Sequence, residues 1–89
     1  MIPNGLVTLF WDVNPSEFDP TKYPDYTIYR VLEYGDDDAV TWARETFGED
    51  EIRRVLRQER RLSRKSATFW ALVYDIPDHE VAALAEPGL

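Results

Sequence analysis

Glycine and proline divide most of this chain into short segments, and each segment repeats its apolar residues at helical spacing. Between Pro24 and Gly35, for example, Ile28, Val31 and Leu32 recur as they would on one face of a helix. Alternating strand patterns are absent beyond residue 13. The sequence therefore predicts an all-α fold, a compact bundle of four to five short helices.

The expected helix boundaries come from capping chemistry. Proline is favoured at a first helical position, aspartate and serine at N-caps, and glycine just past a C-terminus. A single turn at Ser16–Asp19 should be interrupted by Pro20, and Ile76-Pro77 should end the helix before it. Helices are expected to begin at Pro24, Asp36–Asp38, Glu49 and either Ser63 or Ser66, followed by a terminal helix over Asp78–Leu84.

A chain of 89 residues is long enough for one domain and too short for two. We expect an extended arm over 1–15, a helical core over 16–85 and a tail over 86–89. Trp42 and Trp70 lie mid-helix among apolar neighbours and are expected in the core. The absence of cysteine, of a signal peptide and of a long apolar run predicts a soluble, cytoplasmic protein.

Positive charge is concentrated in residues 53–65, here called the cationic segment. It holds seven of the ten basic residues and one acid, Glu59, so it carries +6 while the remainder carries −13, for a net charge of −7. Such polarity indicates an anionic partner at this segment. The candidate residues for an anion or nucleic-acid face are Arg53, Arg57, Arg60, Arg61, Arg64 and Lys65.

If one helix continued from Glu49 to Lys65, these cations would form two neighbouring stripes opposite an apolar side. Glu49 and Asp50 stand four residues before Arg53 and Arg54, which favours ion pairs of about 0.2–0.5 kcal/mol each. Some cations would remain unpaired. They would bind nucleic acid or an acidic protein patch, or serve as a solubilising face.

A helix–turn–helix is the alternative interpretation of the C-terminal half. Helices over 52–59 and 66–74 would place four residues near the start of a recognition helix, namely Arg64, Lys65, Ser66 and Thr68. Beyond Thr68 that helix is apolar, so we expect it to be buried rather than to read bases. DNA binding therefore stands as the second hypothesis.

Phe10 and Trp11 are candidate partner-binding residues of the arm, with packing on the chain's own core as the equal alternative. A third hypothesis is a structural domain that forms a homodimer through these two residues. Asp36–Asp38 are interpreted as a helix cap rather than a metal site, and His79 as a surface residue. No catalytic motif or cofactor-binding loop is present, so we expect neither an enzyme nor a cofactor.

Two blocks, LFWDVNP at Leu9–Pro15 leading to RVLEYG at Arg30–Gly35, and LSRKSATFWAL at Leu62–Leu72, resemble a small bacterial family. Its members read LFWDVDPE…ERVLEYGD and LSRKTANFWAL. Genes for members of this family often lie beside genes for nucleotidyltransferase toxins of the AbiEii/AbiGii type. This resemblance implies an antitoxin or accessory partner of such a toxin, and it carries no functional residues over.

Overall fold

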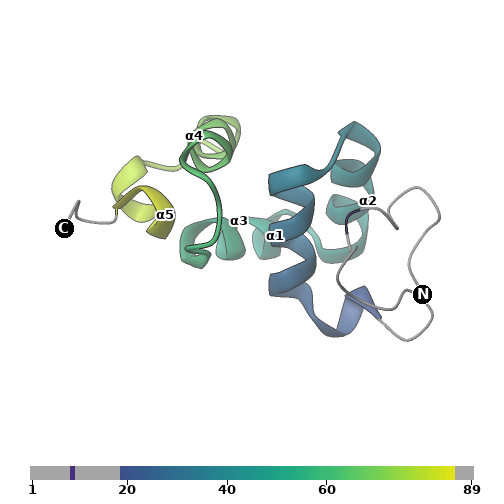
Figure 1. The fold of residues 1–89 in the computed structure, drawn as a ribbon. Helices are drawn as coiled ribbons and strands as arrows, with labels where there is room; N and C mark the ends of the chain where they lie inside the picture. Colours follow the sequence, from purple (N-terminus) through teal and green to yellow (C-terminus); the bar gives the residue numbers. More distant parts are fainter. Residues whose placement is uncertain (1–8, 10–18, 86–89) are drawn as a thin grey trace.

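The structure, a computed structural model, describes Leu9 and residues 19–85, and every regular element in that part of the chain is helical (Figure 1). This confirms the predicted all-α fold. The elements are η2 (Pro20–Lys22), α1 (Pro24–Tyr34), α2 (Asp37–Phe47), α3 (Glu49–Gln58), α4 (Arg64–Val73), η3 (Asp78–Glu80) and α5 (Ala82–Ala85).

The predicted caps set the starts of the helices. Pro24 opens α1. The Asp36 carboxylate accepts a hydrogen bond of 3.0 Å from the Ala39 amide at the start of α2. Of the two serines left open by the sequence, Ser63 caps α4, because its Oγ accepts from the amide of Ser66 at 3.1 Å. Each cap satisfies an amide that the first helical turn leaves without a partner.

The two glycines between helices serve different purposes. Gly48 has φ of 86° and ψ of 158°, a backbone conformation that residues with a Cβ rarely adopt. Gly35 ends α1, as the sequence predicts, but its backbone is extended, with φ of −78°, so it needs no left-handed conformation. A Cβ at Gly35 would lie 2.6 Å from the Val31 carbonyl oxygen and 2.9 Å from the Ala39 Cβ. Close packing of α1 against α2 therefore requires this glycine.

Pro20 begins a 3-10 turn that Asp19 caps through the Thr21 amide at 3.0 Å. The turn expected over Ser16–Asp19 lies almost entirely outside the described residues. Helix α4 ends at Val73, and Asp75 in the link that follows takes a φ of 55°. One predicted element differs from expectation. The terminal helix is split into η3 and α5 at Val81, whose side chain is fully buried.

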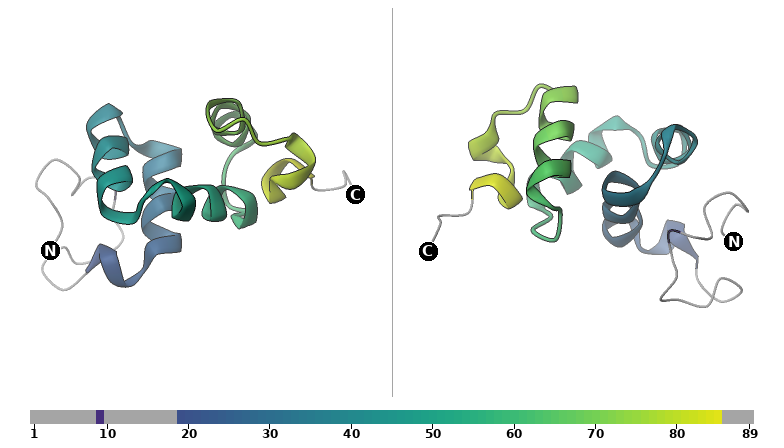
Figure 2. Two further views of the ribbon diagram at one scale, coloured as in Figure 1. Left: turned by 180° about the vertical axis from the view of Figure 1, so that it is seen from behind. Right: turned by 45° about the horizontal axis from the view of Figure 1, so that its top comes forward.

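Helix α3 is central to the packing (Figures 1 and 2). It contacts α1 and α2 on one side, and α4 and α5 on the other. Its buried residues Ile52, Val55 and Leu56 join the two groups into one hydrophobic core. Trp70 lies in that core, as predicted, whereas Trp42 is only partly buried against it.

Leu9 also belongs to the core, with 7% of its surface exposed. The buried Arg30 of α1 donates a hydrogen bond of 3.3 Å to the Leu9 carbonyl. The Arg30 guanidinium also stacks on the ring of Tyr26 at 4.9 Å. The segment expected to be an arm is thus anchored to α1 at Leu9.

Candidate protein-binding surface

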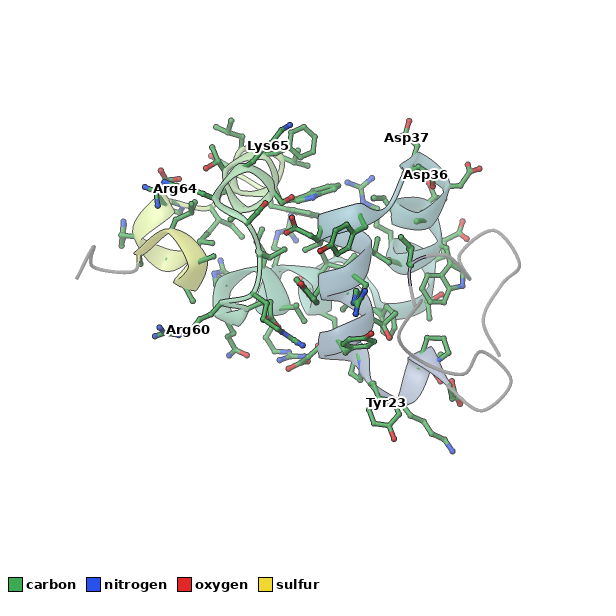
Figure 3. All side chains as sticks on the ribbon, in the orientation of Figure 1. Tyr23, Asp36, Asp37, Arg60, Arg64 and Lys65 are labelled. Atoms are coloured by element: carbon green, nitrogen blue, oxygen red, sulfur yellow. The ribbon has the colours of Figure 1, made fainter. Side chains whose placement is uncertain are left out.

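The cationic segment does not form a single helix. Helix α3 ends at Gln58, and Glu59, at φ −81° and ψ 115°, leaves the helical conformation. Arg60 and Arg61 therefore lie in the connection, and Arg64 and Lys65 open α4. The expected cationic stripes from Arg53 to Lys65 do not exist. Figure 3 shows Arg60 well away from Lys65.

Several cations of the segment are engaged by acids in a different register from the one expected. Glu49 pairs with Arg44 at 3.6 Å rather than with Arg53. Arg53 pairs with Asp50 at 3.7 Å, three residues away. The predicted i,i+4 pairs are therefore wrong. Helical side chains at i,i+3 are also neighbours, and the sequence does not decide between the two spacings.

Arg54 joins two helices. Its Nη2 lies 2.6 Å from Asp25 of α1 and 2.6 Å from Glu51 within α3. These hydrogen bonds raise the pKa of Arg54 and lower the pKa of Glu51. Arg57 reaches Glu80 of η3 at 3.5 Å. Both arginines therefore link α3 to other elements of the fold.

Arg61 is held equally firmly. Its Nε lies 2.7 Å from Glu59, and its guanidinium is stacked 4.6 Å above the ring of Tyr29. The hydrogen bonds from Arg61 lower the pKa of Glu59, and the same bonds raise the pKa of Arg61. Of the predicted anion-binding residues, Arg53, Arg57 and Arg61 are thus bound to acids of this chain.

Arg64 and Lys65 differ from these residues. Both are exposed, and neither has an ion-pair partner among Leu9 and residues 19–85. They lie in the first turn of α4, where the helix dipole disfavours positive charge. Figure 3 shows both on α4, across the molecule from Asp36 and Asp37. These two residues are the part of the cationic segment that remains available to an anionic group.

Helix α4 also exposes large apolar side chains. Leu72 is 78% exposed, Phe69 56% and Val73 46%. The expectation that this helix is buried beyond Thr68 is therefore only half right. Ala67, Trp70 and Ala71 face the core, and the Trp70 indole donates to the Leu32 carbonyl at 2.8 Å. Once Trp70 faces inward, the helical period turns Phe69 and Leu72 outward.

Two hollows flank Phe69. One, of about 450 Å³, is lined by Glu33, Gly35, Ser63, Lys65 and neighbouring residues of α1 and α4. The other, of about 300 Å³, lies between α2 and α4 and is lined in part by Val40, Arg44 and Val73. We name the exposed side of α4 the α4 face. It consists of Arg64, Lys65, Thr68, Phe69, Leu72 and Val73.

The remaining candidate residues add little to the description of a binding site. Phe10 and Trp11 lie outside the described residues. His79 is exposed, and its Nε2 lies 3.9 Å from the adjacent Glu80. Within the described part of the chain, no cluster of three potential metal ligands occurs. No helix in that part is both long and apolar enough to cross a bilayer.

Comparison with family models gives a match. The model of a family of unknown function (DUF6922) matches residues 7–56, more than half of the chain. That span includes Leu9, Arg30 and most of α3, and it ends before the α4 face begins. No curated protein and no solved structure matches the chain.

Proposed function

Since the chain belongs to DUF6922, a family of unknown function, we propose its function from its surface: it is a non-enzymatic protein-binding module that acts through the α4 face. The observation that carries the proposal is that one helix combines exposed Phe69, Leu72 and Val73 with Arg64 and Lys65. These two cations have no ion-pair partner in the described part of the chain. Contiguous exposed apolar side chains with a charged rim are typical of protein-binding sites.

The α4 face specifies the chemistry of its partner. An apolar side chain of the partner fits beside Phe69, in either of the two hollows. An acidic group on the partner pairs with Arg64 and Lys65 at the start of the helix. Because Leu72 is the most exposed of the large apolar residues, it should supply the largest gain in buried apolar area.

For the identity of the partner we propose a nucleotidyltransferase toxin of the AbiEii/AbiGii type, encoded beside this protein. The support is the resemblance of the LFWDVNP, RVLEYG and LSRKSATFWAL blocks to a bacterial family found in that gene context. The excess of acidic residues outside the cationic segment suits an antitoxin that covers a basic nucleotide-binding cleft. Such a pair would act in the cytoplasm without a cofactor.

Co-expression with the neighbouring toxin tests this proposal. The wild-type protein should restore growth and copurify with the toxin. Leu72→Glu should lose both properties, because a carboxylate would be buried against an apolar surface. Thr46→Glu is the matched control, since Thr46 is an exposed residue of α2 outside the α4 face. Wild-type protein that neither rescues growth nor copurifies would refute the toxin as partner. Equal behaviour of the two variants would refute the α4 face as the site that binds the partner.

DNA binding is the second candidate function, favoured by one observation. Arg64 and Lys65 lie at the start of the second helix of the α3–α4 pair, where recognition helices contact DNA, and neither is paired with an acid among the residues that the structure describes. These two cations can neutralise about two phosphates, so the affinity for DNA should be weak. The logarithm of the association constant should fall with the logarithm of the salt concentration with a slope of about −2. Gel-shift titrations of wild-type protein and Arg64→Ala/Lys65→Ala over a salt series test this. Absence of binding at low salt would exclude DNA.

A further inference from the structure

Helix α4 carries charges of opposite sign at its two ends. Arg64 and Lys65 open the helix, and Asp75 follows two residues after its last turn. All three side chains are exposed, and none of them has an ion-pair partner within Leu9 and residues 19–85. Arg53, Arg54, Arg57 and Arg61 are paired with acids, so Arg64 and Lys65 differ from most other cations of the segment.

The residues between these charges form an apolar stripe. Lys65, Thr68, Phe69 and Leu72 follow the i, i+3, i+4, i+7 spacing, so they lie on one side of the helix. Each of the four is exposed. Thr68 is small, and it lies next to the larger Phe69 and Leu72. Alternation of small and large side chains along a stripe allows two helices to interlock.

We propose that the α4 face binds a second copy of this chain, with the two α4 helices antiparallel about a two-fold axis at the level of Trp70. Lys65 and Asp75 are equally distant from Trp70 along the chain, so in this register Lys65 of each copy faces Asp75 of the other. Leu72 and Thr68 are related in the same way, so each Leu72 packs against the small Thr68 of the second copy, beside Phe69.

Self-complementarity favours a second copy over an unrelated partner. A two-fold interface needs a surface that matches itself when reversed. Reversal of α4 places its positive start against its negative end and its large apolar side chains against a small one. A surface made of one helix face is small, so we expect a dissociation constant in the micromolar range, about 1–100 μM.

This inference deepens the proposed function, because it concerns the same face. A homodimer through α4 covers Leu72 and Phe69, so a heterologous partner must displace the second copy. The dimer would then regulate access to the binding face. The dimer itself can be tested on the purified full-length protein alone, whether or not the toxin assignment is correct.

Light scattering coupled to gel filtration provides the first measurement. At a few hundred micromolar the wild-type protein should have an average mass well above its monomer mass of 10.4 kDa, and this mass should rise toward twice that value with concentration. Leu72→Glu should run as a monomer, while Thr46→Glu should remain a dimer. Circular dichroism should show that Leu72→Glu stays folded, since Leu72 is 78% exposed. A monomeric wild type, or a dimeric Leu72→Glu, would overturn the proposal.

Charge reversal tests the register. Lys65→Glu and Asp75→Lys should each weaken the homodimer by about tenfold or more, because each places like charges opposite one another twice. A mixture of the two variants should restore the dimer, since both of its contacts then join opposite charges. Asparagine tolerates the φ of 55° at position 75, so Asp75→Asn removes the charge without backbone strain. It should weaken the homodimer less than Asp75→Lys does.

These outcomes separate the two proposals. Restoration by mixing occurs only if Lys65 and Asp75 of different copies meet, so its absence refutes the antiparallel register. A wild-type monomer that still copurifies with the toxin would refute the homodimer and leave the protein-binding function standing. A homodimer that never releases its α4 face to the co-expressed toxin would refute the heterologous partner instead.

Discussion

Arg54 and Lys65 carry the same charge but differ in what they offer to a partner. Arg54 gives its guanidinium to Asp25 and Glu51, both at 2.6 Å, and so connects α1 to α3. Lys65 is exposed, and no acid within the described residues pairs with it. A net charge assigned to the cationic segment therefore overstates its attraction for an anion. Pairing within the fold determines which cations remain available.

Glu59 should make stability depend on pH. Its pKa is lowered in the folded protein by hydrogen bonds from Arg61. A lowered pKa stabilises the fold above the unfolded value of about 4.5, and this contribution is lost as pH falls through the folded pKa. Glu59→Gln should therefore cost about 1 kcal/mol at pH 7. The difference between wild type and variant should shrink as pH falls below about 4.5, as measured by urea unfolding. A difference that persists unchanged at pH 3 would contradict this account.

Gly35→Ala should destabilise the protein through crowding rather than through backbone strain. The new Cβ would lie 2.6 Å from the Val31 carbonyl oxygen of α1 itself and 2.9 Å from the Ala39 Cβ of α2. The end of α1 would therefore have to shift, and α2 would have to move away. We expect a loss of about 1–3 kcal/mol in the free energy of unfolding. Adding Ala39→Gly removes one of the two clashes and should recover part of the loss, beyond what Ala39→Gly does alone. No recovery would mean that the α1–α2 contact is not the cause.

At the scale of elements, the sequence predicts the starts of helices well because caps are local. Pro24, Asp36 and Ser63 act within one turn of their own positions. Separate helices starting at Glu49 and at Ser63 or Ser66 imply a break near Glu59, but residues 58–63 contain no strong helix breaker that fixes its position. Tertiary contacts explain it: the Ser63 amide donates to Glu33 of α1 at 2.8 Å, and Arg61 stacks on Tyr29. Those contacts cannot be read from local spacing.

The α4 face illustrates the same limit. Phe69, Leu72 and Val73 look like core residues in a sequence, because apolar residues at helical spacing are most often buried. Only the position of α4 against α1 and α3 decides which side Trp70 takes, and the remaining apolar residues follow. The sequence of this helix contains too few polar residues to cover a whole solvent-facing side. That shortage is the signal that could have revealed an exposed apolar face.

Capping of α2 provides an element-scale prediction. Asp36 accepts the Ala39 amide at 3.0 Å, whereas Asp37 is an exposed residue within the first turn. Asp36→Ala should lower the free energy of unfolding by about 1 kcal/mol, the usual effect of losing a cap. Asp37→Ala, which removes the same charge, should cost only about 0.3–0.5 kcal/mol through the helix dipole. Thermal unfolding of the two variants measures the difference, and equal losses would contradict a capping role for Asp36.

At the scale of the whole molecule, apolar surface is distributed in an unusual way. The core includes Leu9, which is distant in the sequence from the helices that it packs against. Arg30 of α1 donates a hydrogen bond to the Leu9 carbonyl. At the same time, Leu72 stays in solvent. A small domain has little apolar area to spare, so exposing a leucine on a helix loses stability that burial would supply. Binding of a partner recovers that area, which is the physical basis for the function proposed for the α4 face.

The same substitution at these two leucines tests this distribution. Leu9→Ala should lower the free energy of unfolding by about 2–5 kcal/mol, because it leaves a cavity in the core. Leu72→Ala should change it by no more than about 0.5 kcal/mol when measured at a concentration where the protein is monomeric, since Leu72 is 78% exposed. Leu72→Ala should nevertheless weaken self-association, which Leu9→Ala should leave intact wherever the variant is folded. Similar losses of stability at both positions would mean that Leu72 packs within the monomer and is not available to a partner.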